Sequence, residues 1–170
     1  MKPDLTGTRV VLRTIGPQDA ADLFEIYGNP LTMVFASDPC FTSPAMVAQM
    51  MASVVRLEQT DESLEWAIVE REGNKVIGTC GLHSFAGDAG LRQAEVGCML
   101  ARSHWGQGLM GEALTAVMGY AGELGIHTLL ADIEPGNLPS QRLFRRLGFV
   151  WQQGTLDRLE RQEGIRRCPW

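Results

Sequence analysis

The pattern of apolar and polar residues changes about halfway along the chain. In the first half, the spacing of the apolar residues and the turn residues between them predict a strand, two helices and then three further strands. Their ranges are 9–13 for the first strand, Pro17 to residues 28–30 for the first helix, 43 to about 59 for the second helix, and 64–70, 75–83 and about 92–101 for the later strands. The turn residues Gly73-Asn74 predict a hairpin between the first two of these later strands. This half therefore predicts antiparallel pairing.

The second half alternates strand and helix, which requires crossover connections and parallel pairing. One apolar stripe with a 4-3-4-3 spacing predicts a helix that Gly125 closes; its members are Met110, Leu114, Val117, Ala121 and Leu124. A buried strand is expected over 128–133, a helix over 137–147, and a last strand from Phe149. The whole pattern predicts an α+β protein with a mixed central sheet, antiparallel in its N-terminal half.

Length and charge limit the classes of protein that fit. A chain of 170 residues with 45% hydrophobic residues suits a single domain over 1–170. A net charge of -5 opposes a general nucleic-acid surface, which needs a clustered positive field. No window reaches the roughly 20 apolar residues of a membrane span, and the first residues lack the apolar core of a secretory signal. We therefore expect a cytoplasmic protein that binds neither membranes nor nucleic acids.

The residues that bind metals are scattered along the chain. There is no CxxC pair, no HExxH helix and no carboxylate cluster among them. The sequence therefore predicts reduced cysteines and no metal; the residues concerned are Cys40, Cys80, Cys98, Cys168, His83, His104 and His127.

The segment Gly106-Gln107-Gly108-Leu109-Met110-Gly111 lies between a predicted strand and a predicted helix. Backbone N–H groups and the helix dipole converge there, which suits a pyrophosphate. The string also fits the GxGxxG fingerprint of dinucleotide-binding oxidoreductases, with Asp132 about 20 residues on, and glycines can serve a tight turn alone. Two observations count against the dinucleotide-binding alternative. Four residues, 102–105, separate the strand from the first glycine, and the preceding chain is hairpin-like.

A second motif follows the turn: Asn137-x-x-Ser140-x-Arg142-Leu143-Phe144-x-x-Leu147-Gly148-Phe149. Together with Trp105-Gly106-Gln107-Gly108-Leu109-Met110-Gly111, it resembles the GNAT N-acetyltransferases, and within them the RimJ/RimL-type branch, which includes ribosomal-protein N-terminal acetyltransferases. The resemblance covers nearly the whole chain. It implies a three-layer α/β/α GNAT fold and acetyl transfer from acetyl-CoA to a primary amine of a protein N-terminus or a small molecule, through a tetrahedral intermediate. A non-catalytic CoA-binding regulatory module is the alternative.

The resemblance also implies which residues bind the cofactor. The strand before the turn is expected to splay from the next parallel strand, so that main-chain groups of Met99, Leu100 and Ala101 pair with pantetheine. An N–H near Met99 would polarise the thioester carbonyl. The pyrophosphate would lie on the turn itself, formed by Trp105, Gly106, Gln107, Gly108, Leu109, Met110 and Gly111.

Three residues near the second motif complete the expected cofactor site. Asn137 is expected both to cap the last long helix and to face the cofactor. Phe144 stands where many members of the family have a tyrosine, so it packs or contacts CoA. Ser140, one turn earlier on the same face, would supply the missing hydroxyl for the leaving thiolate; its alternative is a local hydrogen bond at the helix start.

Glu95 is the candidate base, because the acceptor amine must lose a proton before it attacks. It lies in Ala94-Glu95-Val96-Gly97, and strand alternation places Glu95, Gly97 and Met99 on one face. The alternative is a solvated or salt-bridged carboxylate on a strand.

The acceptor is expected to be selected by the 29–41 loop and the final hairpin. The excess of acidic over basic residues favours a cationic acceptor. A basic neighbourhood around the anionic cofactor is predicted from Arg102, His104, Arg142, Arg145 and Arg146. The alternative for each of these residues is an exposed charge on a helix. The end of the chain, 165–170, predicts a shortened or irregular closing strand, since Pro169 cannot donate to a ladder. Such a strand would either open the acceptor site or be compensated by a neighbouring subunit in a homodimer.

Overall fold

The structure, a computed structural model, describes residues 2–88, 92–153 and 158–162. Its elements in chain order are β1 (Leu5–Thr6), β2 (Val10–Thr14), a 3-10 turn (Pro17–Asp19), α1 (Ala20–Tyr27), α2 (Pro44–Gln59), β3 (Ser63–Glu70), β4 (Lys75–Ala86), β5 (Gln93–Leu100), a second 3-10 turn (Arg102–His104), α3 (Leu109–Glu123), β6 (Thr128–Asp132), α4 (Leu138–Arg146), β7 (Val150–Trp151) and β8 (Arg158–Gln162).

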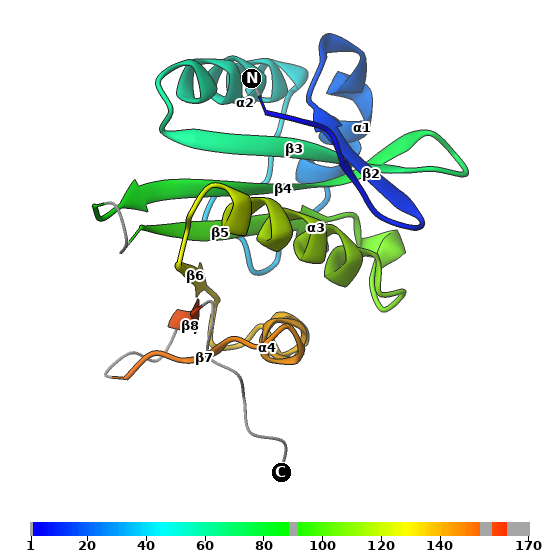
Figure 1. Cartoon of the computed structure of the whole chain (residues 1–170). Helices are drawn as coiled ribbons and strands as arrows, with labels where there is room; N and C mark the ends of the chain where they lie inside the picture. The colour runs from blue at the N-terminus through cyan, green and yellow to red at the C-terminus, as the bar shows by residue number, and fades with distance from the viewer. Residues whose placement is uncertain (1, 89–91, 154–157, 163–170) are drawn as a thin grey trace.

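The strands form one mixed sheet in the order β1-β2-β3-β4-β5-β6-β8-β7 (Figure 1). β5 and β6 pair in parallel, and the other neighbouring strands pair antiparallel. The predicted mixed sheet is thereby confirmed. The predicted helix and strand boundaries agree with the structure to within a few residues.

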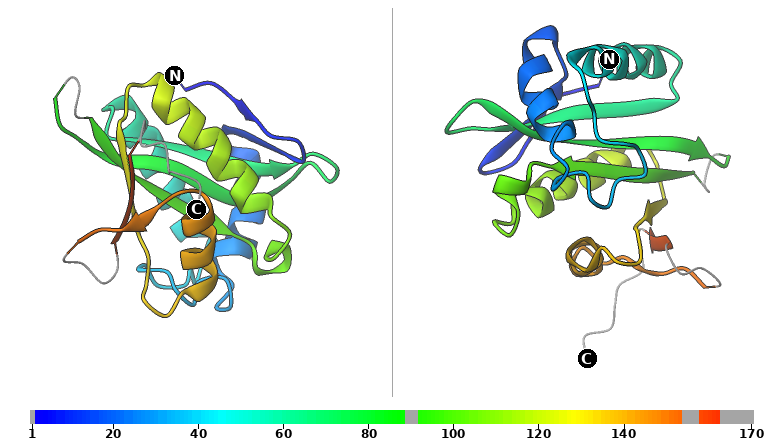
Figure 2. Two further views of the ribbon diagram at one scale, coloured as in Figure 1. Left: turned by 60° about the horizontal axis from the view of Figure 1, so that its bottom comes forward. Right: turned by 180° about the vertical axis from the view of Figure 1, so that it is seen from behind.

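Helices cover both faces of the sheet (Figure 2). Apolar residues of α3, such as Leu114 and Val117, pack with Phe144 of α4 in the larger core on one face. On the opposite face, Leu23 and Ile26 of α1 form a smaller core with Val47 of α2. This arrangement gives the three layers that the resemblance implied.

Local sequence signals explain where the helices begin and end. Pro44 occupies the first turn of α2, where its missing N–H costs nothing. Gly125 has a positive φ of 71° just after α3, a conformation that glycine adopts without strain. Asn137 Oδ1 accepts a hydrogen bond from Ser140 N at 3.2 Å and so caps α4.

The described part of the chain contains no helix of the length and apolarity that crossing a membrane requires. Within the same residues, no group of three or more His, Cys, Asp and Glu side chains could hold a metal ion. Cys40, Cys80 and Cys98 are free thiols, as expected. Cys168 and the predicted closing strand at 165–170 lie outside the described residues.

Candidate active site

The strands β5 and β6 pair only at one end and then separate (Figure 1). Parallel pairing runs from Gln93 opposite Thr128 to Glu95 opposite Leu130. On its other edge, β5 remains paired with β4 as far as Leu100. Within the described residues, the edge of β5 beyond Glu95 therefore has no neighbouring strand on the β6 side.

The direction of the main-chain groups along β5 follows from one hydrogen bond. Ala101 N donates to Ile77 O at 2.8 Å, so the main-chain groups of Ala101 point towards β4. The directions of the main-chain N–H and C=O groups alternate along an antiparallel strand. Those of Met99 therefore also point towards β4, whereas those of Cys98 and Leu100 point to the opening. Met99 and Ala101 were expected to bind pantetheine through their main-chain groups, but these groups face β4. The main-chain groups of Cys98 and Leu100 face the opening instead, so Leu100 remains a candidate and Cys98 is added.

The glycine turn has the backbone geometry that an anion site needs. Gly106 and Gly108 have φ values of 76° and 80°, which side chains disfavour. Gly108 is the N-cap of α3 and offers no side-chain cap, so the first N–H groups of the helix are not satisfied by a capping side chain. Leu109 and Met110 are buried and anchor the start of α3 in the core.

Two residues that sequence reasoning missed, Arg9 and Glu112, hold this turn. Arg9 Nη1 donates to Gln107 O at 2.9 Å, and Arg9 Nε forms an ion pair with Glu112 Oε2 at 3.1 Å. Burial opposes ionisation of Glu112, but hydrogen bonds from Arg9 and Val10 hold the pKa of its carboxyl below the ordinary value. The partners lie about a hundred residues apart, so no local pattern could identify them.

The second motif lies beside the turn. A Cβ on Gly111 would be 3.4 Å from Leu143 Cδ1 of α4, an ordinary van der Waals contact. Ser140 is half-buried, and its hydroxyl has no hydrogen-bond partner among the described residues. Phe144 is 2% exposed and packs edge-to-face on Phe149, with ring centroids 5.0 Å apart. Phe144 is therefore a packing residue.

The 29–41 loop reaches both sides of the opening. Thr32 Oγ1 accepts a hydrogen bond from Arg102 N at 3.2 Å, just before the glycine turn. Phe35 lies 3.6 Å from the position that a Cβ on Gly136 would occupy, just before α4. The loop that was expected to select the acceptor is thus positioned next to both motifs.

Glu95 is engaged by the protein on both carboxylate oxygens. Arg158 Nη2 contacts Oε1 at 3.0 Å, and Ser84 Oγ donates to Oε2 at 3.3 Å. His83 Nδ1 lies 3.5 Å from the same Oε2. Arg158 also pairs with Asp132 at 2.6 Å, so it joins β5, β6 and β8. The geometry agrees with the salt-bridged alternative for Glu95.

A buried polar chain lies on the same face as Glu95 and was not expected from the sequence. Tyr27 Oη and Thr79 Oγ1 are 2.7 Å apart, and Glu65 lies on the same face of the sheet. Burial raises the pKa of Glu65 to about 7, although the nearby Thr79 hydroxyl and the charge of Lys2 lower it. In the sequence, Glu65 looked like one ordinary polar position of an alternating strand.

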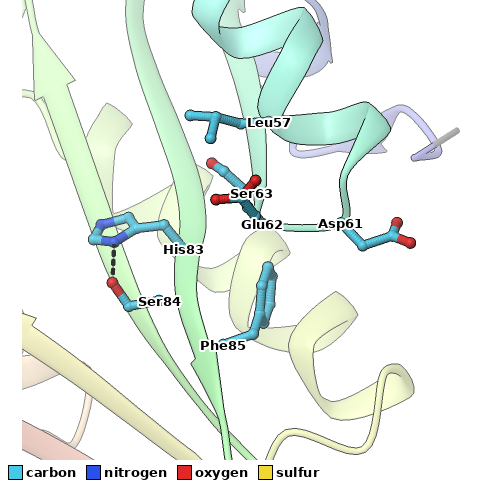
Figure 3. Close-up of a pocket in the computed structure, with 7 residues that line it drawn as sticks. All are labelled: Leu57, Asp61, Glu62, Ser63, His83, Ser84 and Phe85. Atoms are coloured by element: carbon cyan, nitrogen blue, oxygen red, sulfur yellow. Dashed lines mark hydrogen bonds between the residues drawn. The ribbon is translucent and has the colours of Figure 1, made fainter.

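One cavity borders this region, and a second lies on α4 and β7. The first, of about 620 Å³, opens where β3 begins and β4 ends (Figure 3), and its lining residues are Leu57, Asp61, Glu62, Ser63, His83, Ser84 and Phe85. His83 and Ser84 connect it with Glu95. The second, of about 490 Å³, is lined by Arg142, Arg145, Arg146, Phe149, Val150 and Trp151.

The five residues of the predicted basic neighbourhood do not form one cluster in the structure. Three of its arginines line the second cavity on α4. Arg102 instead lies over the ring of Trp105, 4.4 Å from its centroid, and His104 lies 3.9 Å from Glu70.

Comparison with known proteins gives consistent results. Residues 9–150 match the family profile described as "Acetyltransferase (GNAT) domain". The chain is 29% identical to the uncharacterized N-acetyltransferase p20 of Bacillus licheniformis, over 92% of this chain and 86% of p20. It is also 29% identical to the uncharacterized N-acetyltransferase YoaA of Bacillus subtilis, over 96% of this chain and 92% of YoaA.

Among solved structures, the fold is similar to that of Mycobacterium smegmatis RimJ in complex with CoA-disulfide. The TM-score is 0.80 at 17% identity, and the alignment covers 95% of this chain and 88% of RimJ. The family match and the antiparallel first half of the sheet exclude the dinucleotide-binding alternative.

Proposed function

The chain belongs to the GNAT acetyltransferase family, whose members use acetyl-CoA, and we propose that it holds this cosubstrate in the opening between β5 and β6 and acetylates a primary amine. The observation that carries the proposal is the end of parallel pairing at Glu95 and Leu130. It leaves a strand edge whose main-chain groups can bind an extended, amide-containing arm.

The residues present fit the chemistry of CoA. The N–H and C=O groups of Cys98 and the N–H of Leu100 suit the amides of pantetheine, while the carbonyl of Leu100 accepts a hydrogen bond from Trp105 Nε1. The start of α3 behind Gly106 and Gly108 has no capping side chain and suits a pyrophosphate. Bound acetyl-CoA would supply an activated acetyl thioester. The N–H of Cys98 points to the opening and would stabilise the negative charge that develops on the thioester oxygen.

Ser140 is the proposed proton donor to the leaving thiolate. Its hydroxyl makes no hydrogen bond within the described residues, and the cap formed by Asn137 Oδ1 on Ser140 N fixes its position at the start of α4. A thiol is a tolerable leaving group, since its ordinary pKa is about 8.5, so help from Ser140 should be modest.

The acceptor class that we propose is a cationic primary amine, either a protein N-terminus or a small molecule. Asp61 and Glu62 line the cavity that borders Glu95, and the chain carries a net charge of -5, which attracts a cation. The similarity to RimJ in fold and the two sequence motifs favour the RimJ/RimL-type branch.

The test measures binding and turnover separately. Calorimetry with acetyl-CoA gives its affinity, and release of CoA thiol over a panel of peptides with free N-termini, polyamines, amino acids and aminoglycosides gives turnover. We expect tight binding and transfer to at least one cationic amine. Tight binding without transfer to any amine would support the non-catalytic module, and failure to bind acetyl-CoA would overturn the proposal.

A further inference from the structure

The end of β4 carries a bulge that turns two neighbouring side chains towards Glu95. His83 pairs with Glu95, and the register then shifts before Ala86, so β4 has one extra residue at this point. Ser84, next to His83, has a positive φ of 52°, a conformation that side chains rarely adopt. Bulges re-aim side chains and are common beside active sites, and strained backbone of this kind also clusters there. The bulge brings the ring of His83 and the hydroxyl of Ser84 to the same carboxylate.

The hydrogen bonds of this cluster determine which nitrogen of His83 carries the hydrogen. Ser84 Oγ donates to Glu95 Oε2 at 3.3 Å, and His83 Nδ1 lies 3.1 Å from the same Oγ, the contact drawn in Figure 3. A hydroxyl has one hydrogen and a carboxylate can only accept, so the hydrogen of Ser84 goes to Glu95. Ser84 Oγ therefore accepts from His83 Nδ1. The neutral ring then carries its lone pair on Nε2, which is free to accept a proton.

His83 Nε2 lies next to the proposed acetyl position. A Cβ on Gly97 would be 3.2 Å from Nε2, so the ring of His83 lies over this glycine. Gly97 precedes Cys98, the residue whose N–H we assigned to the thioester oxygen. Within the part of the chain that the structure describes, no hydrogen bond reaches Nε2. The nitrogen that can accept a proton is therefore one residue along β5 from the proposed oxyanion donor.

The imidazole is also accessible to an acceptor. The side chain of His83 is 40% exposed, and together with Ser84 it lines the cavity of about 620 Å³. Asp61 and Glu62 line the same cavity, and their charges attract a cationic amine. An acceptor in this cavity therefore meets the ring of His83 directly.

Glu95, the candidate base from the sequence, is engaged differently. Arg158 contacts Oε1 at 3.0 Å, and Ser84 donates to Oε2 at 3.3 Å. An incoming ammonium group would have to compete with one of these partners. The carboxylate is instead placed to compensate a positive charge on His83, since Nδ1 lies 3.5 Å from Oε2. A carboxylate that orients a histidine and stabilises its charged form is a recurring arrangement in catalysis.

We propose that His83 takes the proton of the acceptor ammonium group on Nε2, and that Glu95 and Ser84 are positioning residues that orient the imidazole and stabilise its charged form. This inference rests on the proposed acetyl transfer and names its base. It assigns to His83 the proton transfer for which the sequence suggested Glu95.

The proton balance is complete without a further reactant. The acceptor R–NH₃⁺ gives one proton to His83 Nε2 and becomes R–NH₂, whose lone pair forms the new bond to the thioester carbon. When the C–S bond breaks, the sulfur keeps the bonding electrons and takes one proton from the nitrogen, directly or through Ser140. The products are the amide and CoA thiol, and the imidazolium of His83 returns its proton to water.

The first experiment compares His83→Gln with His127→Gln, a substitution at an exposed histidine between α3 and β6. Glutamine has about the size of histidine but cannot take a proton, so we expect His83→Gln to lower kcat/KM by about a hundredfold or more. The affinity for acetyl-CoA should stay within about twofold, because proton transfer plays no part in binding it. His127→Gln should match the unchanged protein. Wild-type turnover by a folded His83→Gln variant would overturn the inference and leave the acetyltransferase proposal standing.

Chemical rescue separates a base from a structural residue. His83→Ala leaves room for free imidazole, which can take the proton in place of the missing ring. We expect added imidazole to raise the kcat/KM of His83→Ala by about tenfold or more and to leave that of the unchanged protein as it is. A loss of rate that imidazole does not restore would give His83 a structural role and overturn the inference.

Ser84→Gly tests whether the hydroxyl acts through His83. The change removes the hydroxyl and keeps the positive φ, which glycine adopts without strain. We expect kcat/KM to fall about tenfold in the unchanged protein and not to fall further in the His83→Gln background, because residues that act as a unit are not additive. Glu95→Gln should show the same dependence on His83. Asn74→Gly, at a positive φ in the β3–β4 turn, is the matched control. Equal losses in both backgrounds would contradict the positioning roles.

Gly97→Ala decides the question if neither His83 variant folds. The new Cβ would lie 3.2 Å from His83 Nε2, so the ring has to move away from its place over β5. We expect a lower kcat/KM in a protein that still unfolds cooperatively on heating. Turnover equal to that of the unchanged protein would overturn the role of His83.

Discussion

Trp105 Nε1 donates a hydrogen bond to the carbonyl oxygen of Leu100 at 2.7 Å. The residue that opens the glycine turn is thereby tied to the last residue of β5, and Arg102 lies over the same indole ring. The bond uses a carbonyl that points to the opening rather than to β4. It links the strand edge proposed for pantetheine to the turn proposed for pyrophosphate.

Trp105→Phe keeps an aromatic ring beneath Arg102 and removes this bond. We expect acetyl-CoA to bind roughly two- to tenfold more weakly, which corresponds to the ~0.5–1.5 kcal/mol of one net hydrogen bond. The turnover number should change little, because the reacting groups are untouched. Calorimetry with Trp151→Phe, an exposed tryptophan on β7, as the control would check this; equal affinities for both variants would argue against a role for the bond.

Asp19 should control the stability of the protein at acid pH. It is 2% exposed, and both of its oxygens contact Arg13 at 2.8 Å, while Gly16 N donates to one of them. Burial opposes ionisation, but the hydrogen bond from Arg13 and the bond from Gly16 hold the pKa of Asp19 below its ordinary value. A lowered pKa in the folded state stabilises the protein above the unfolded-state pKa, ~3.9, and this stability is lost as pH falls through the folded-state value.

Asp19→Asn should therefore lower the free energy of unfolding by ~2–4 kcal/mol at pH 7, because Arg13 loses its charged partner. The difference from the unchanged protein should shrink as the pH is lowered below about 4. Urea unfolding between pH 3 and pH 7 measures both effects, with exposed Asp38→Asn as the control. A difference that does not depend on pH would show that ionisation of Asp19 is not its cause.

The elements of the fold were predictable because their boundaries are encoded locally. Pro44 marks the start of α2, Gly125 follows the end of α3, and Asn137 caps α4, so each signal lies within a few residues of the boundary it sets. The alternation of apolar residues then decides which face each element buries.

The site was less predictable because it depends on contacts between distant segments. The hydrogen bond from Ala101 N to Ile77 O shows which main-chain groups of β5 point to the opening. The alternation of apolar and polar residues in the sequence shows the two faces of a strand, but it does not distinguish its two edges. Glu95 pairs with Arg158, 63 residues away.

Asn137→Ala should affect stability more than catalysis. The side chain caps α4, and loss of an N-cap costs ~0.5–2 kcal/mol. Thermal unfolding of Asn137→Ala and Asn137→Asp measures this cost, because aspartate can accept the same hydrogen bond. Equal stability of the alanine and aspartate variants would contradict the capping role.

Ser140→Ala should lower kcat by roughly two- to tenfold and leave the affinity for acetyl-CoA unchanged, because alanine keeps the backbone N–H that Asn137 binds. Ser140→Thr retains a hydroxyl and should recover part of the rate. Steady-state kinetics across pH 6–9 checks the assignment. The loss of kcat in Ser140→Ala should be larger with a less reactive acceptor amine, because departure of the thiolate then limits the rate. A kcat equal to that of the unchanged protein would assign proton transfer to water.

The thiols should differ sharply in reactivity towards iodoacetamide. Burial raises the pKa of Cys98 to about 12 and raises that of Cys80 well above its ordinary value, so very little of either is the reactive thiolate at pH 8. Cys40 is partly exposed, and no disulfide involves it. Peptide mapping by mass spectrometry after brief alkylation should find Cys40 modified well before Cys80 and Cys98. Rapid modification of Cys98 in the folded protein would mean that the β5 edge opens to solvent more than the packing of this strand implies.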